Sequence, residues 1–126
     1  MRTVSVRYRR YKTSVDMRFL LNAHIDRFNA AVLSGHFNEM VSHFAEDASM
    51  SFEGVSVGPF HGREAIAAAY ATQPPDDQLL LLEVLHERPD LIEVSYAWAK
   101  GPEKRAGTMT VEGRDGLISS LVVRFE

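Results

Sequence analysis

His24 is the titratable side chain whose position in the sequence best suits proton transfer. An imidazole changes its charge near neutral pH and can act as a general base or acid. His24 precedes Phe28 by four residues, so both side chains share one face of the helix predicted around them. The sequence places no partner near His24 that would fix its tautomer. A hydrogen-bonded structural histidine is therefore the interpretation that competes with a catalytic base.

A second group of reactive side chains alternates along the segment 105–112. Thr108, Thr110 and Glu112 lie on one face of the predicted strand, and Met109 and Val111 lie on the other. If the polar face points inward, the threonines can donate hydrogen bonds to a ligand, and Glu112 can act as a base near the opening. The pattern alone leaves open which face points inward, and a solvated polar face is the alternative.

The other four histidines, His36, His43, His61 and His86, show no spacing typical of a metal site. The chain has no His-x3-His pair backed by a carboxylate and no cysteine. We therefore expect no metal ion and no cofactor. The lack of cysteine also excludes disulfides and favours a reducing, cytoplasmic location.

The composition is typical of one folded domain. The 126 residues are 45% hydrophobic and 25% charged, and no apolar run approaches the roughly 18 residues that span a bilayer, so we expect no membrane partner. Residues 1–18 hold six basic side chains and one acidic one, although the net charge is −3. The rest of the chain is therefore acidic and repels phosphate, so we expect no nucleic-acid partner. We divide the sequence into a basic arm, residues 1–16, and a domain, residues 17–126.

The elements that must position these side chains follow a simple order, with helices first and strands last. Apolar residues recur at intervals of three and four over 14–34, and a shorter helical pattern follows over 37–44. A strand is predicted over 48–53, and an alanine-rich helix over 63–72 ends at Pro74-Pro75. Four β-prone runs follow, separated by short turns, at 79–87, 91–100, 105–112 and 117–125. This order predicts an α+β fold with an antiparallel meander.

Four short motifs follow one another along residues 17–126. They are Arg27-Phe28-Asn29-Ala30-Ala31 with Ser34-Gly35, then Phe44-Ala45-Glu46-Asp47-Ala48, then Phe60-His61-Gly62-Arg63-Glu64-Ala65-Ile66, and finally Arg114-Asp115-Gly116-Leu117-Ile118 with Val123-Arg124-Phe125. Together they resemble the SnoaL-like and ketosteroid-isomerase-like branch of the nuclear-transport-factor-2-like superfamily. The resemblance implies a cone, in which N-terminal helices pack on a curved, mostly antiparallel sheet whose open end admits a ligand. Members include isomerases, cyclases, dehydratases and non-catalytic adaptors, so the fold does not define the function.

The resemblance also implies where a ketosteroid isomerase would carry its catalytic groups. Those enzymes hold an oxyanion with a helix tyrosine and a late-strand carboxylic acid, and they move the proton with a strand aspartate. The matching positions here are Phe28, Thr108 and Phe52. A phenyl ring neither donates a hydrogen bond nor accepts a proton, so we expect no steroid isomerase catalysis. Tyr70 matches a tyrosine that lies inside the pocket of those enzymes, and it is either a phenol aimed at a ligand or an aromatic core residue.

Side-chain parity predicts an aromatic lining for the cone, because Tyr96 and Trp98 share a face of one predicted strand. The resemblance favours inward-facing threonines on the segment 105–112. The expected ligand-binding residues are Phe28, Phe52, Tyr70, Tyr96, Trp98, Thr108, Thr110, Leu121, Val123 and Phe125. The candidates for catalysis are His24, Tyr70 and Glu112.

Two hypotheses for the function remain open. In the first, the cone binds a small hydrophobic molecule, aromatic or polycyclic, and could catalyse an isomerase, cyclase or dehydratase reaction. In the second, aromatic side chains fill the cone, and the chain is a non-catalytic dimeric interaction module. The segment 79–85 is apolar on both faces apart from Glu83, which predicts a strand buried on both sides and a homodimer through the outer sheet face.

Overall fold

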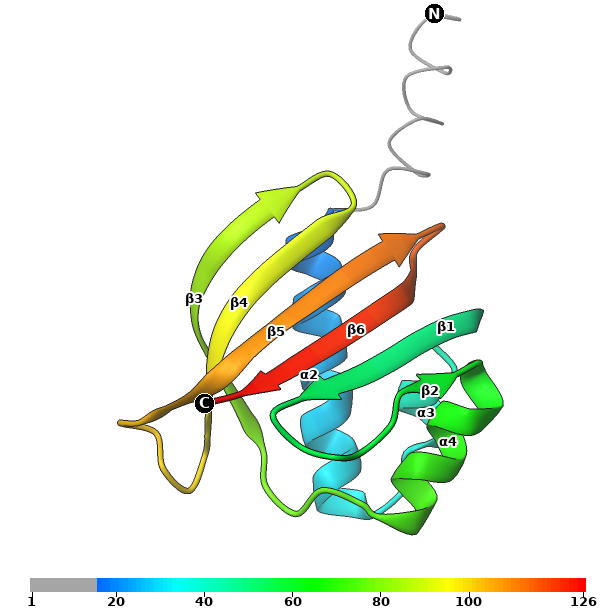
Figure 1. The fold of residues 1–126 in the computed structure, drawn as a ribbon, viewed down its shortest axis with the longest axis horizontal. Coiled ribbons are helices and arrows are strands. Elements are labelled where there is room, and N and C mark those ends of the chain that lie inside the picture. Colours follow the sequence, from blue (N-terminus) through cyan, green and yellow to red (C-terminus); the bar gives the residue numbers. More distant parts are fainter. Residues whose placement is uncertain (1–15) are drawn as a thin grey trace, which may run out of the picture.

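The computed structural model describes residues 16–126, so the basic arm lies outside the described residues except for Asp16. Within these residues, three helices pack against one curved sheet of six strands (Figure 1). The elements are α2 (Met17–Ser34), α3 (Asn38–Val41), β1 (Phe44–Glu53), β2 (Phe60–His61), α4 (Arg63–Thr72), β3 (Leu79–Arg88), β4 (Leu91–Trp98), β5 (Arg105–Arg114) and β6 (Leu117–Phe125). Within residues 16–126, no helix combines the length and the apolar character needed to cross a bilayer.

The expected α+β cone is confirmed. The strand order is β2-β1-β6-β5-β4-β3, with antiparallel neighbours throughout except for the parallel pair of β1 and β6. The last four strands form the predicted meander, and Asp115-Gly116, both at positive φ, make the tight turn between β5 and β6. Helix α2 crosses behind the sheet in Figure 1, whereas α4 lies beside β1 and β2.

Local signals explain both ends of α2. The Asp16 carboxylate accepts a hydrogen bond from the Arg18 amide at 3.0 Å, which caps the first turn. Gly35 ends the helix at φ 81°, a left-handed conformation that suits glycine, and donates to the Ala31 carbonyl. The buried stripe of α2 comprises Met17, Leu20, Leu21, His24, Ile25, Phe28 and Ala31, so the predicted apolar face is the one that meets the sheet.

The helical pattern predicted over 37–44 gives way to a strand. The α-helix there covers only Asn38–Val41, and β1 begins at Phe44, earlier than the predicted residue 48. Pairing with β6 explains the change, because Phe44 lies opposite Ile118, and the Ile118 amide donates to the His43 carbonyl at 3.0 Å. Strand pairing between distant segments has overridden a local periodicity.

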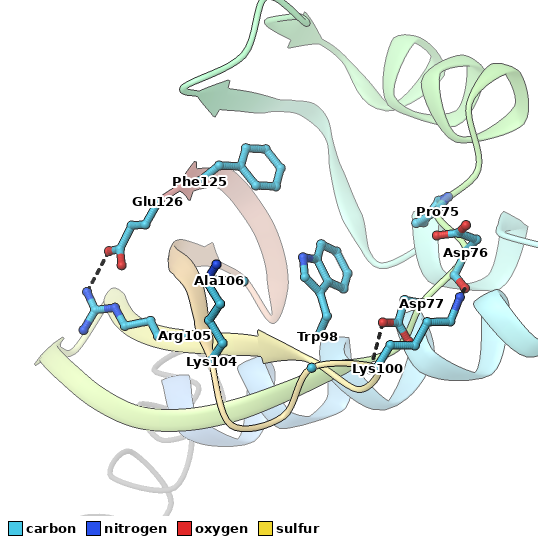
Figure 2. Close-up of a pocket in the computed structure, with 11 residues that line it drawn as sticks. Pro75, Asp76, Asp77, Trp98, Lys100, Lys104, Arg105, Ala106, Phe125 and Glu126 are labelled. Carbon is cyan, nitrogen blue, oxygen red and sulfur yellow. Dashed lines mark hydrogen bonds and ion pairs between the residues drawn. The ribbon is translucent and has the colours of Figure 1, made fainter.

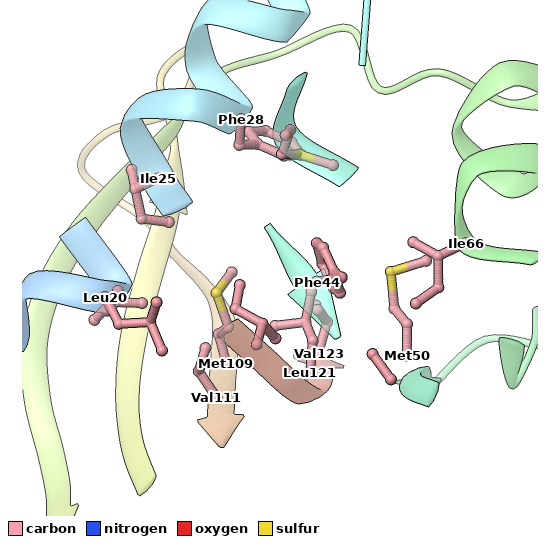
Figure 3. Close-up of a cluster of buried hydrophobic side chains, with 14 of the residues drawn as sticks. Leu20, Ile25, Phe28, Phe44, Met50, Ile66, Met109, Val111, Leu121 and Val123 are labelled. Atoms are coloured by element: carbon pink, nitrogen blue, oxygen red, sulfur yellow. The ribbon is translucent and has the colours of Figure 1, made fainter. Parts of the chain in front are cut away.

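The core lies between α2, the inner sheet face and α4. Figure 3 shows Phe28 on α2, Met109 on β5 and Leu121 on β6 converging with Met50 on β1 and Ile66 on α4. The last three are 2% exposed or less. This core fixes the position of α2 relative to the meander, and that position determines where the cone remains open.

Candidate functional site

A cavity of about 180 Å³ lies between α2 and the inner face of the sheet. Its wall is mainly apolar and aromatic, which suits a hydrophobic ligand. The lining residues are His24, Phe28, Phe52, Tyr70, Gln73, Pro75, Leu79, Tyr96, Trp98, Met109, Leu121, Val123 and Phe125. They come from α2, β1, α4 and the loop after it, and the four strands of the meander. Elements from both ends of the sequence therefore build one wall.

Two aromatic pairs shape this wall. The Tyr96 and Trp98 rings on β4 meet edge to face, with their centroids 5.7 Å apart. The Phe52 and Phe125 rings lie nearly parallel, with their centroids 6.2 Å apart. Edge-to-face and offset contacts are the favoured geometries for aromatic pairs. The rings therefore narrow the cone without filling it.

The expectation that Thr108 and Thr110 point into the cone is wrong. Met109, the residue between them, lines the cavity, and both threonines are absent from its wall. Thr110 instead accepts a hydrogen bond from Arg124 at 3.3 Å, and Arg124 also pairs with Glu53 at 2.8 Å. The register of β5 against β4 and β6 places this polar row on the outer face. Strand alternation then turns the next residue inward.

The three candidates for catalysis do not form one cluster. His24 and Tyr70 both line the cavity, whereas Glu112 is exposed and does not reach its wall. Glu112 belongs to the same outer row of β5 as the two threonines, and its register partners are Leu91 and Ser120. We therefore withdraw the expectation that it acts as a base at the opening.

Burial makes His24 a poor base. The imidazole is 2% exposed and packs edge-on against the Phe44 ring, with centroids 5.6 Å apart. Loss of hydration lowers the pKa of His24 to about 4, and the positive charge of Arg27 contributes to the same shift. His24 is therefore neutral at neutral pH, and it presents a hydrogen-bonding ring to the cavity rather than a charge.

Two tyrosines also contribute to the wall, in different settings. The Tyr70 ring stacks on Phe37 with centroids 5.1 Å apart, and burial raises the pKa of its phenol. Tyr96 is fully buried, and burial followed by the Glu126 carboxylate raises the pKa of Tyr96 to about 12. Both phenols stay protonated at neutral pH, so both can donate a hydrogen bond.

A wider, open depression of about 810 Å³ adjoins the cavity. Pro75, Trp98 and Phe125 belong to the walls of both, so they form the passage between them. Figure 2 shows the ion pair of Arg105 and Glu126, 2.9 Å apart, on one side of Trp98. On the other side, Lys100 donates from its amide to the Asp77 carboxylate at 3.0 Å. The entrance is therefore charged, whereas the cavity behind it is apolar.

Sequence reasoning missed several residues of the wall, namely Gln73, Pro75, Leu79 and Met109. Met109 belonged to the face of its strand that parity could not assign. Gln73 and Pro75 lie in the segment after α4, whose path depends on how α4 docks. Leu79 is held by Asn29 on α2, whose side-chain amide donates to the Leu79 carbonyl at 3.0 Å and accepts from the Leu79 amide at 2.7 Å.

No protein-family model matches this sequence, and no curated protein is detectably similar to it. Solved structures do match. An NTF-2-like protein of unknown function from Burkholderia xenovorans LB400 superposes with a TM-score of 0.63 at 16% identity, over 86% of this chain and 84% of that one. RV0760c from Mycobacterium tuberculosis, solved with estradiol-17β-hemisuccinate, gives 0.62 at 19% identity, over 80% and 89%. A computationally designed 17-OHP binder gives 0.62 at 19% identity, over 82% and 88%.

These likenesses bear on the fold. The chain has the nuclear-transport-factor-2-like fold, as the sequence motifs indicated. At such low identity the shared architecture does not transfer a ligand or a reaction, because one fold supports many functions.

Proposed function

We propose that this nuclear-transport-factor-2-like domain binds a small, flat hydrophobic molecule inside its cone. The observation that carries the proposal is the cavity of about 180 Å³ with its aromatic and aliphatic wall. An apolar cavity of roughly 150 Å³ is large enough to admit benzene. The inner space therefore suits a compound of one or two rings. A longer polycyclic molecule would extend past Trp98 and Phe125 into the open depression.

Two of the similar structures support a ligand of this kind. RV0760c was solved with a steroid ester, and the designed protein is a 17-OHP binder. Both superpose on this chain with a TM-score of 0.62, which supports the view that a fold of this kind can hold such a molecule. The cavity wall is apolar, whereas the entrance is charged. The part of the ligand that lies inside the cavity should therefore be apolar.

Binding is better supported than catalysis. Proton transfer is the reaction class favoured by the resemblance, and it needs a base whose pKa is near the working pH. His24, with a pKa of about 4, is poorly matched to that task. The ketosteroid isomerase positions Phe28 and Phe52 lie at the cavity wall as hydrocarbon rings. We therefore assign His24 and Tyr70 to the wall and propose no reaction.

The fluorescence of Trp98 tests the proposal, since it is the only tryptophan in the chain and it stands between the cavity and the depression. We expect a saturable change in its emission when one- and two-ring aromatic compounds or steroids are titrated in. The variant Trp98→Ala should weaken the binding of flat ligands. Unchanged emission across such a series, together with no small molecule retained by the natively purified protein in mass spectrometry, would refute a binding role.

We also propose a homodimer, on a separate observation. The leucines of β3 were expected to be buried, but only Leu79 is buried in the single chain. Leu80, Leu82 and Leu85 are 39%, 45% and 40% exposed. β3 is an edge strand, since β4 is its sole neighbour in the described sheet. An edge strand with exposed apolar side chains favours a protein partner, and a second copy would cover it symmetrically. A dimer is compatible with ligand binding, whereas the alternative of a completely filled cone conflicts with the cavity.

A further inference from the structure

We infer that the ligand of the cone carries a neutral hydrogen-bond acceptor, most simply a ketone oxygen, which receives the hydrogen of the Tyr96 hydroxyl. This inference rests on the proposed function and narrows its ligand class. Strand alternation in the sequence predicts only that Tyr96 is one of the aromatic residues that line the cone. The structure singles out its hydroxyl, because this group has a specific deficit that a ligand can meet.

The deficit is a buried polar atom without a partner. Tyr96 is fully buried, and within residues 16–126 its Oη has no hydrogen-bond partner. No other buried side-chain nitrogen or oxygen of the described residues shares this state. Buried hydroxyls are nearly always paired, since a lone one loses its hydration without compensation. A buried hydroxyl without a partner, on a tyrosine that lines a cavity, is therefore a feature that a ligand in this cavity would explain.

The position of the hydroxyl follows from the strand register rather than from chance packing. Tyr96 lies opposite Leu81 on β3 and Gly107 on β5, and its ring is fixed edge-on by Trp98. Glycine at position 107 offers no side chain that could hydrogen-bond with the phenol. Met109, Leu121 and Val123, which lie on the same cavity wall, offer no oxygen or nitrogen in their side chains either.

The charge around the phenol indicates which kind of ligand fits. The phenol is protonated at neutral pH, so it offers a donor. The Glu126 carboxylate acts on the phenol from the entrance, and its negative field would disfavour an anionic ligand at the same place. A neutral carbonyl on an apolar ring system satisfies both conditions.

A matched pair of two-ring compounds, indane and 1-indanone, tests the inference on the full chain. They differ by one carbonyl and have nearly the same shape, so the difference in their affinities isolates the oxygen. We expect the parent protein to bind 1-indanone about tenfold more tightly than indane, because the ketone oxygen supplies the hydrogen bond that the buried hydroxyl lacks. The variant Tyr96→Phe should bind both compounds with similar affinity.

Two controls separate the hydrogen bond from general packing. Ser95→Ala removes a hydroxyl that is also buried, at the adjacent position of β4, whose side chain lies on the opposite sheet face. This variant should keep the preference for the ketone. Without ligand, Tyr96→Phe should leave the Tm unchanged or raise it, because it removes an uncompensated polar atom.

The outcomes distinguish the inference from the proposed function. Equal affinity of the parent protein for indane and 1-indanone would overturn the inference while leaving a hydrophobic binding site in place. A ligand-free Tm that falls by about 5 °C or more in Tyr96→Phe would also overturn it, since the hydroxyl would then already be paired. Failure of both compounds to bind to the parent protein would overturn the inference. It would overturn the proposed function as well if the wider ligand series and the mass spectrometry also gave negative results.

Discussion

At the scale of single residues, burial decides what each polar group of the cavity wall can do. His24 loses its hydration between α2 and the Phe44 ring, so it stays uncharged under conditions in which a free histidine would titrate. Tyr96 loses its hydration too, but a phenol is uncharged at neutral pH and retains its donor. The same physical effect therefore weakens the candidate base and preserves the candidate donor.

The first prediction concerns the pH dependence contributed by His24. Above pH 6.5 the histidine is neutral in both the folded and the unfolded chain, so its contribution to stability is fully present. Between pH 6.5 and about 4 the unfolded chain binds a proton that the folded chain does not, so the free energy of unfolding falls. The total loss should be about 3 kcal/mol.

Urea denaturation of the parent chain and of His24→Gln at several pH values between 4 and 7 measures this effect. The variant should lose the part of the pH dependence that lies in this range. His36→Gln changes an exposed histidine and serves as the control. Identical pH slopes in the parent and in His24→Gln would show that His24 is not responsible.

At the scale of secondary-structure elements, one amide joins α2 to the start of β3. Asn29 forms both a donor and an acceptor bond with the backbone of Leu79, fifty residues away in the sequence. The two hydrogen bonds, which we call the Asn29 clamp, satisfy the Leu79 backbone as a neighbouring strand would. Because Leu79 lies at the cavity wall, the clamp also fixes where the wall begins.

The second prediction is that Asn29→Ala lowers the free energy of unfolding by about 2 kcal/mol, since it leaves an amide and a carbonyl of Leu79 without partners. Asn22→Ala is the matched control, because Asn22 is exposed on the same helix and the change in helix propensity is the same. Thermal or chemical denaturation of both variants gives the comparison. Equal stability of the two variants would mean that the clamp contributes nothing.

The third prediction concerns the close approach of β5 and β6 at Gly107. A Cβ atom at this position would collide with the Arg124 carbonyl and lie 3.2 Å from the Cα of Phe125. Both are backbone atoms of β6, so the strands would have to separate. We expect Gly107→Ala to cost about 3 kcal/mol of stability. Gly101→Ala is the control and should change the stability little, because no atom lies within 4 Å of the added Cβ. Equal denaturation midpoints for the two variants would contradict the prediction.

At the scale of the whole molecule, the two faces of the sheet carry different groups. The helices and the core cover the inner face (Figures 1 and 3). The cavity lies on this side of the sheet as well. The outer face carries the network of Arg124 with Glu53 and Thr110. Leu80, Leu82 and Leu85, which are exposed, lie on edge strand β3, at the far end of the sheet from β1 and β2.

The fourth prediction is that the chain sediments as a dimer at micromolar concentration and that Leu82→Glu shifts it toward the monomer. A buried, unpaired carboxylate in an apolar interface is strongly unfavourable. Leu33→Glu is the control, because Leu33 is 75% exposed on α2, away from β3. A parent chain that stays monomeric, or two variants that behave alike, would contradict a dimer built on β3.

The sequence alone determined the elements and their general arrangement. Helix 63–72 and strand 117–125 were predicted with the bounds that the structure has, because apolar periodicity and turn residues are local signals. Strand parity predicted Tyr96 and Trp98 in the aromatic lining, and the family resemblance predicted Phe28. All three residues lie at the cavity wall. Where the apolar residues follow a single helical or strand period and turn residues mark both ends, the sequence is sufficient to place the element.

The tertiary structure decided everything that depends on register and docking. A shift of one residue turns every side chain of a strand to the other face, so Met109 and the threonines beside it could not be assigned until β5 was paired with β4 and β6. The early start of β1, the clamp of Asn29 on Leu79 and the unpartnered hydroxyl of Tyr96 likewise depend on contacts between distant segments. These contacts arise from the packing of whole elements, which local sequence patterns do not encode.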